Sequence, residues 1–349
     1  VQQAANRLAV VPSQKLNVYL IDRIVGQGGF AGTDMVVSYV DRRYAGGGMF
    51  ELFVHEATHI LDQQFAPRRM SFMAEGLAVW ASGGHYKAED LKLRSAALVA
   101  IDQYVPLTEL INDFYPVQHE IGYLEAAGFT TYLIDRAGWN TFREFYSDVS
   151  TEQAATPAEA IDVSLQRYYG ASLAQLEAEW LGELGSLPPN PAMVEDLKTT
   201  IRYYNVARHY QQLYDPTAHF LSAWLPHPMQ VREFGNPADL NRRPEAEINV
   251  TIELMLATAD TAMRSGDYAR ANVILDSVDN ILNNGGAIID PLATSYLKIV
   301  RAADEYGYEL HQVDVAGEKA QALATQAPNI GLTSLVLELR GQNWVILSH

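Results

Sequence analysis

The stretch that most constrains this chain is His55-Glu56-Ala57-Thr58-His59, which is set in apolar sequence. Residues four positions apart leave the same face of a helix one turn apart, so the imidazoles of His55 and His59 can reach one metal ion. Glu56 lies beside the first histidine, where its carboxylate can reach an ion-bound water without being a ligand itself. The pattern predicts a catalytic zinc site with Glu56 as general base.

The sequence around this motif predicts a half-buried helix from about Met49 to Gln64, which ends before Pro67. Apolar side chains recur along it at helical spacing, namely Met49, Phe50, Phe53, Ala57, Ile60 and Leu61. The alternative is an ordinary core helix whose histidines have other partners. That alternative leaves the acidic Glu56 between the two histidines unexplained.

A catalytic zinc ion needs three protein ligands and one open position, so a further ligand is expected. Residues 71–82 predict a second helix, with Glu75 among the apolar side chains Phe72, Met73, Leu77 and Trp80. A carboxylate in such surroundings needs a cation to offset the cost of burial. Zinc would supply it; the alternative is a salt bridge to Arg68 or Arg69. His85, which follows two glycines, is expected to be a surface histidine; the alternatives are that it contacts substrate or replaces Glu75 as ligand.

Composition narrows the class of protein. The chain has 349 residues, of which 48% are hydrophobic and 19% charged, as in ordinary soluble globular proteins. Its net charge of −17 argues against a nucleic-acid partner, because phosphate backbones are bound by clustered Lys and Arg. Cysteine is absent, so thiolate zinc sites and disulfides are excluded. No apolar run reaches the roughly 18 residues that would suggest a membrane span.

The sequence also bears on the cellular compartment of the protein. The chain begins at Val1, which suggests a trimmed or processed form whose signal or anchor lies outside this sequence. The acidic, cysteine-free and tyrosine-rich composition, together with the predicted chemistry, favours an extracellular or cell-envelope location.

Three segments carry a resemblance to a known family. The motif at 55–59 followed by Ala74-Glu75-Gly76 resembles the gluzincin zinc metallopeptidases, most closely the peptidase MA-like group. The segment from Tyr123 to Gly138 is similar to that group's later tyrosine-bearing helix. The segment from Gly170 to Trp180 is similar to the one that closes its domain. The resemblance covers roughly residues 1–187.

The resemblance implies a zinc-dependent metallopeptidase acting on a peptide or protein substrate. It implies His55, His59 and Glu75 as ligands of one Zn²⁺ ion and Glu56 as the base. It also implies Tyr123 as the hydroxyl that stabilises the oxyanion, with Tyr132 as the alternative. The sequence lacks the Gly-x-Met-Glu-Asn motif of the aminopeptidase relatives, so exopeptidase activity is not expected.

The expected fold is mainly helical α+β, with a zincin-like domain over residues 1–187. Residues 16–21 predict a buried strand and residues 34–40 a second one. The second could offer a free edge to an extended peptide or be an ordinary interior strand. Prolines at 188, 189 and 191 place a domain boundary near residues 185–191.

Two further regions are expected beyond that boundary. Residues 192–300 predict a helical region in which 245–263 and 268–282 form one tetratricopeptide-like hairpin. Residues 301–349 predict a β-meander with strands at 310–315, 319–325, 333–340 and 344–347, similar to the small folds of nuclear transport factor 2. The meander could pack with the helical region as one domain.

Two other functions compete with peptide hydrolysis. One is a non-catalytic binding or scaffold protein on a peptidase fold, in which zinc is structural and has a fourth protein ligand. The other is a hydrolase that acts on a substrate other than a peptide. The presence of Glu56 argues against the first, because a structural site has no use for a base.

Overall fold

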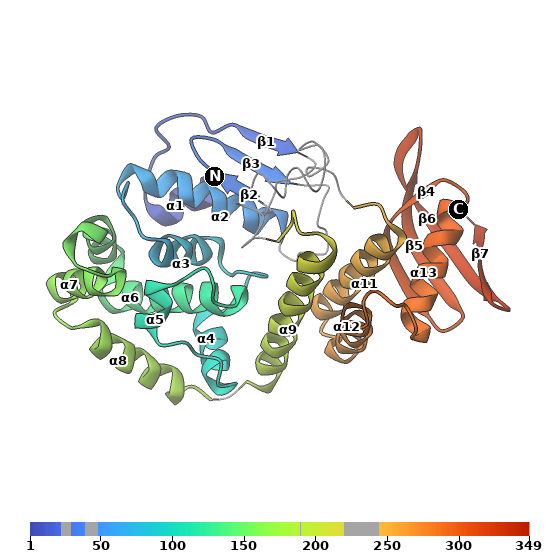
Figure 1. The fold of residues 1–349 in the computed structure, drawn as a ribbon. Helices are drawn as coiled ribbons and strands as arrows, with labels where there is room; N and C mark the ends of the chain where they lie inside the picture. Colours follow the sequence, from blue (N-terminus) through green and yellow to red (C-terminus); the bar gives the residue numbers. More distant parts are fainter. Residues whose placement is uncertain (22–28, 39–47, 189, 220–243, 349) are drawn as a thin grey trace, which may run out of the picture. The chain divides into compact units, whose positions relative to one another are not determined.

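The computed structural model is mainly helical, with a small sheet near each end of the chain (Figure 1). It describes residues 1–21, 29–38, 48–188, 190–219 and 244–348. The predicted mainly helical α+β class is therefore confirmed. Contacts among these residues form two compact units, which divide within one helix, between Ile201 and Arg202. The domain boundaries proposed from the sequence, at 187, 192 and 301, remain predictions.

The N-terminal sheet has the strand order β1-β3-β2. β1 (Val18–Ile21) runs parallel to β3 (Met35–Ser38), and β2 (Gly29–Ala31) runs antiparallel to it. Met35 and Val37 are fully buried in the central strand. Of the two alternatives for the second predicted strand, the structure shows the interior strand and not the free edge, because β3 is paired on both sides; the edge strands are β1 and β2. Residues 39 and 40 of that prediction lie outside the described residues.

The first predicted strand forms, but its predicted burial is wrong. All four side chains of β1 are exposed, with fractions of 42% for Val18, 52% for Tyr19, 54% for Leu20 and 38% for Ile21. The physical reason is its position, since β1 is an edge strand that pairs with β3 alone. An apolar run of this length fits a buried central strand and an exposed edge strand equally well.

Two packed helices carry the predicted motif (Figure 1). α2 (Met49–Leu61) begins after Gly48 and continues as a 3-10 turn over Asp62–Gln64, so the predicted helix tightens in its last turn. α3 (Ser71–Ser82) has the predicted bounds and buries nearly all its side chains. Two members of the predicted apolar stripe, Met49 and Phe50, are instead exposed at the start of α2.

α3 lies along α6 (His119–Asp148), the longest helix of this unit. A β-carbon at Gly76 would lie 2.5 Å from the backbone oxygen of Ala126 and 2.7 Å from the hydroxyl of Thr130. Only glycine allows so close an approach of two helix backbones. The glycine after Glu75 therefore lets α3 pack tightly against α6, which fixes the depth at which Glu75 is buried.

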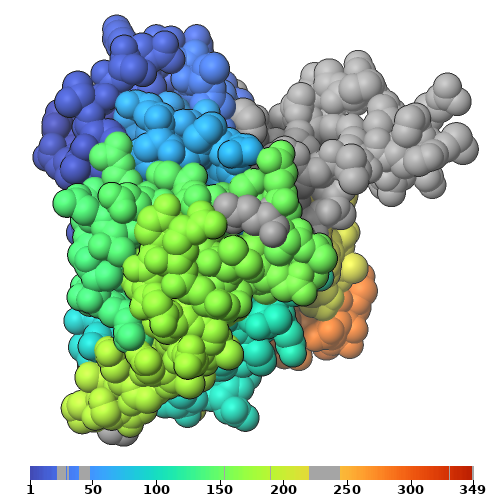
Figure 2. Space-filling model, turned by 90° about the vertical axis from the view of Figure 1, so that its left-hand side faces the viewer, coloured from blue at the N-terminus to red at the C-terminus, as the bar shows by residue number. Residues whose placement is uncertain are grey.

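Shorter helices complete the first unit. Figure 2 shows this unit from the end that α7 and α8 occupy, with the N-terminal residues in blue at the top. Their bounds are α1 (Gln2–Leu8), α4 (Leu91–Ala100), α5 (Leu107–Asn112), the 3-10 turn η3 (Thr151–Gln153), α7 (Pro157–Tyr169) and α8 (Leu173–Ser186). α7 and α8 each begin with a capping box, formed by Thr156 with Glu159 and by Ser172 with Gln175.

The second unit joins helices to an antiparallel meander. Its helices are the C-terminal part of α9 (Pro191–Tyr214), α11 (Glu247–Arg264), α12 (Tyr268–Asn283) and α13 (Pro291–Asp304). Its strands are β4 (Tyr308–Ala316), β5 (Lys319–Gln326), β6 (Asn329–Arg340) and β7 (Asn343–Ser348). Strands pair in chain order, as predicted, and α11 and α13 pack against the sheet.

A buried carboxyl in the first unit makes folding stability depend on pH. Glu125 on α6 is fully buried, and its Oε1 accepts a hydrogen bond from the backbone N–H of Val105 at 2.8 Å. Burial raises the pKa of Glu125 from 4.5 to about 9. The folded chain thus keeps a proton at pH 7 that the unfolded chain releases. The stability associated with this group is present below pH 4.5 and is lost as pH rises toward 9.

Replacing Glu125 with glutamine is expected to raise the free energy of unfolding at pH 7 by on the order of 2 kcal/mol, because glutamine cannot ionise. Urea unfolding of the variant and of the wild type at pH 5 and pH 8 measures this. The free energy of unfolding of the variant should exceed that of the wild type by more at pH 8 than at pH 5. The control Glu109→Gln, which changes an exposed carboxyl, should show no such increase with pH. An equal difference at both pH values would rule out the neutral buried carboxyl.

Candidate metal centre

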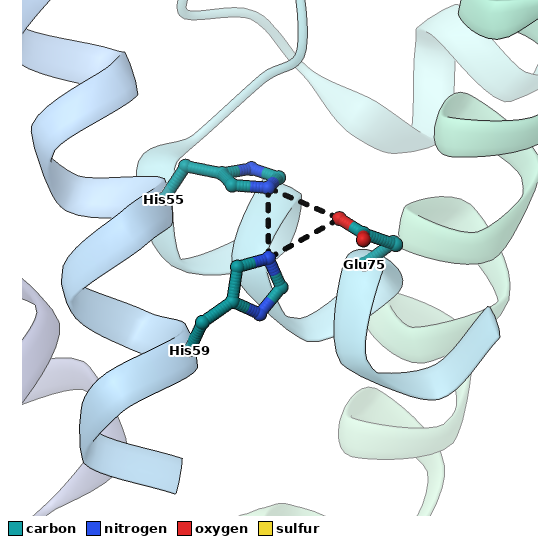
Figure 3. Close-up of side chains that lie close together, drawn as sticks. All are labelled: His55, His59 and Glu75. Atoms are coloured by element: carbon teal, nitrogen blue, oxygen red, sulfur yellow. Dashed lines mark hydrogen bonds and ion pairs between the residues drawn. The ribbon is translucent and has the colours of Figure 1, made fainter. Parts of the chain in front are cut away.

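Three side chains converge from two helices (Figure 3). His55 and His59 extend from successive turns of α2, and Glu75 faces them from α3. The two Nε2 atoms lie 3.1 Å apart, and Glu75 Oε2 lies 3.1 Å from the first and 3.3 Å from the second. The structure thus brings together the three residues that the sequence predicts as ligands.

These separations suit a small ion. Zinc–nitrogen and zinc–oxygen bonds of about 2.0–2.2 Å in a tetrahedron place neighbouring ligand atoms about 3.3 Å apart. The three observed separations are 3.1–3.3 Å. Among the described residues, His55, His59 and Glu75 form the group of three His or carboxylate side chains able to hold a metal ion. Two imidazoles and one carboxylate are also a donor set that zinc accepts.

The electrostatics of the cluster favour a cation. Burial acts to raise the pKa of Glu75, but the charge of His59 and hydrogen bonds from both imidazoles outweigh it and hold that pKa well below its usual range. Burial acts to lower the pKa of His59, but Glu75 outweighs it and the pKa is raised. The carboxylate of Glu75 is therefore stable in its charged form, which favours a cation beside it.

The salt bridge weighed as the alternative role for Glu75 does not form. Arg68 pairs with Glu152 at 2.8 Å, and Arg69 pairs with Asp62 at 3.0 Å. The cationic side chains closest in sequence are thus engaged elsewhere, and the ion-pair partners of Glu75 are the two imidazoles.

Glu56 is buried beside this cluster, between α2 and strand β2. A β-carbon at Gly29 of β2 would lie 2.7 Å from Glu56 Oε1, so the strand backbone forms one wall around the carboxylate. Burial raises the pKa of Glu56 to about 7; His55 opposes this shift and Glu75 adds to it. A carboxyl that titrates near neutrality suits an acid–base role.

Gly29→Ala is expected to displace the Glu56 carboxylate while leaving the three clustered side chains in place, because the new methyl would occupy the space of Oε1. We expect hydrolytic activity to fall by about tenfold or more, since about 1 Å of misplacement can cost up to 100-fold. Parallel assays of activity and zinc affinity test this. Unchanged activity would mean that β2 does not set the position of Glu56.

A buried network supports the second histidine. Arg69 Nη2 donates to the backbone oxygen of His59 at 2.8 Å, and its ion-pair partner Asp62 accepts a hydrogen bond from the Tyr146 hydroxyl at 2.6 Å. Burial raises the pKa of Asp62 to about 6, against the opposing charge of Arg69. The sequence did not predict this network, since it offered Arg69 only as a possible salt-bridge partner of Glu75.

The predicted tyrosines differ in their distance from the cluster. The ring of Tyr123 lies 6.3 Å from that of His55 and 4.8 Å from that of His85. Tyr132 lies elsewhere: its hydroxyl donates to Glu179 at 3.1 Å and accepts from Arg136 at 2.8 Å. Tyr123 is therefore the better placed of the two, and its role as the oxyanion hydroxyl remains a prediction.

His85 is held by a carboxylate. Its Nδ1 lies 2.6 Å from Glu120, which also accepts a hydrogen bond from the fully buried Arg94 at 3.2 Å. His85 does not belong to the group of residues able to hold an ion. The cluster therefore uses Glu75, and the alternative in which His85 replaces it is not supported.

One residue of the site was not predicted. The Tyr115 hydroxyl lies 3.3 Å from Glu75 Oε1, the carboxylate oxygen that does not face the imidazoles. Tyr115 lies in the turn between α5 and α6, which carries no recognisable motif. Sequence alone gave no signal for this contact.

No family model matches the chain, and neither the curated proteins nor the solved structures searched contain a match. The connection to a family thus rests on the motif and on the geometry of the site. None of the helices formed by the described residues has the length and apolar character needed to cross a bilayer.

Proposed function

We propose that this chain is a zinc-dependent metallopeptidase of the gluzincin type, resembling the peptidase MA-like group, and that it hydrolyses peptide bonds. The observation that carries the proposal is the convergence of His55, His59 and Glu75, with the buried Glu56 beside them. The motif supplies a base next to a set of three ligands, which is the arrangement that catalytic zinc requires.

In this proposal, His55, His59 and Glu75 would hold the ion through the atoms that converge in the structure. Zinc, when bound, supplies Lewis acidity, which acidifies a water molecule and polarises a carbonyl. Glu56 takes the proton from the attacking water and passes it to the leaving amine. Burial raises the pKa of Glu56, which favours its acceptance of that proton. Tyr123 is proposed as the hydroxyl that stabilises the developing oxyanion.

The competing proposal, a scaffold protein with structural zinc, has less support. A structural zinc site is usually closed by four protein ligands. The group found among the described residues contains three ligand side chains. The residue that follows His55 in the motif is Glu56, which does not belong to that group. An open position beside a base is the arrangement of a hydrolytic centre.

The proposed partner is a peptide or protein substrate, and the net charge of −17 continues to disfavour nucleic acid. An extracellular or cell-envelope location is proposed with it, because the composition and the chemistry agree with a secreted hydrolase. Fractionation of the native host, with the chain followed by antibody, would test that location.

The function is tested with a peptide library, whose cleavage by the zinc-loaded chain is followed by mass spectrometry. We expect new peptide termini to appear, to disappear on treatment with a chelator, and to return when zinc is added back. Cleavage that persists without metal would contradict the proposal. So would a zinc-loaded chain that cleaves no peptide in the library.

A further inference from the structure

The two oxygens of the Glu75 carboxylate have different partners. Oε2 faces both imidazoles, at 3.1 Å from His55 and 3.3 Å from His59. Oε1 lies 3.3 Å from the hydroxyl of Tyr115. The carboxylate is therefore restrained from two sides, and the atom directed at the candidate ion position is a single oxygen.

The direction of the tyrosine contact follows from chemistry. An ionised carboxylate has no proton, so it can only accept, and the Tyr115 hydroxyl must donate to Oε1. The Ser71 hydroxyl forms a second hydrogen bond with Tyr115, one turn before Glu75 on α3. A phenol keeps its proton at neutral pH, because the ordinary pKa of tyrosine is about 10. Ser71 and Tyr115 thus form a short chain of donors that ends on Glu75.

The turn that carries Tyr115 is anchored to the core. Its neighbour Phe114 is buried, with its ring 6.2 Å from that of Phe72 and 5.2 Å from that of Tyr123. Tyr115 itself is 39% exposed at the rim of the site. The phenol therefore has a fixed position, yet its hydroxyl can be removed without opening a cavity in the core.

We propose that Tyr115 is a positioning residue for the metal ligand Glu75: its hydroxyl holds Oε1, so that Oε2 alone is presented to the ion. The inference rests on the proposed metal site and adds a residue that supports it. Partners that orient a metal ligand from behind typically contribute 10–100-fold to metal affinity. Without the hydroxyl, the carboxylate can rotate, and ordering it again opposes metal binding.

The test compares Tyr115→Phe with the wild type and with Tyr19→Phe, which removes an exposed phenol hydroxyl from β1 of the same unit. Zinc affinity is measured by competition with a chromophoric chelator. Cobalt is loaded separately, because its visible absorption reports the arrangement of the ligands. Circular dichroism and urea unfolding establish that all three proteins are folded.

For Tyr115→Phe we expect zinc affinity about 10-fold lower or more and an altered cobalt spectrum, with both unchanged in Tyr19→Phe. Ser71→Ala should show the same change to a smaller extent. An affinity within about twofold of wild type would overturn the inference, as would a loss of affinity with an unchanged cobalt spectrum. If the wild type itself bound neither metal, the proposed function would fail first, and Tyr115 would have no ligand to position.

Discussion

Replacing Glu56 with glutamine is expected to abolish peptide hydrolysis while the chain keeps its zinc. Glutamine has nearly the same size and shape as glutamate, so packing against Gly29 is preserved, but it cannot take a proton from water. General acid–base catalysis contributes about 100- to 10,000-fold, and the turnover of this variant should fall by that amount. Zinc content and turnover, measured on the same sample, give the result.

The matched control is Glu51→Gln, which makes the same chemical change in the first turn of the same helix. It should keep both zinc and activity. Glu56→Gln with full zinc content and full activity would remove Glu56 from the mechanism. Loss of zinc together with activity would instead identify Glu56 as part of the ion-binding group.

Replacing Glu75 with glutamine is expected to lower zinc affinity by more than about 100-fold, and activity should be lost with the metal. The change removes one of three ligands, a larger loss than the 10–100-fold that removal of a supporting partner typically causes. It also removes the negative charge that the two imidazoles face. Competition titration with a chromophoric chelator measures the affinity.

Glu125→Gln serves as the control for this second variant, because Glu125 is also a buried carboxyl, on α6, and its Oε1 accepts a hydrogen bond from the backbone N–H of Val105. It does not belong to the group of residues able to hold a metal ion. Its zinc affinity should equal that of the wild type. An unchanged affinity in Glu75→Gln would show that the third ligand is another residue and that the convergence seen in Figure 3 does not bind metal.

The parts of the site that sequence predicts well are those that depend on local periodicity. The spacing of His55 and His59 places two imidazoles on one helix face wherever that helix lies. The bounds of α3 follow from its dense apolar run, and Glu75 stands out there because a buried carboxylate needs a cation. The meander is predicted for a similar reason, since residues of β5 alternate in burial: Ala320, Ala322 and Ala324 are buried, whereas Lys319, Gln321 and Leu323 are exposed.

The parts that sequence misses are contacts between distant positions. Tyr115 is 40 residues from Glu75, and Tyr146 is 84 residues from Asp62. Neither pair has a pattern that a local rule could detect, because the folding of α3, α6 and the intervening turn brings them together. The exposure of β1 was missed for the same reason, since the order of strands in a sheet is decided by tertiary packing.

The C-terminal unit contains the meander and the helices α11 and α13 that pack against it. One face of its sheet is buried, with Leu335 and Leu337 of β6 inaccessible to solvent. Among the described residues, none of its side chains belongs to a group able to hold a metal ion. The candidate metal centre therefore lies in the first unit, on α2 and α3.

The central claim is that one zinc ion is held by His55, His59 and Glu75 with a position left open for water. X-ray absorption at the zinc edge of the zinc-loaded chain tests it most directly. We expect two imidazole nitrogens at about 2.0–2.1 Å and two oxygens at about 2.0–2.2 Å, one of them from water. Loss of one imidazole in His59→Ala should be visible in the same spectrum. Three or more imidazoles in the wild type, or no bound zinc, would contradict the claim.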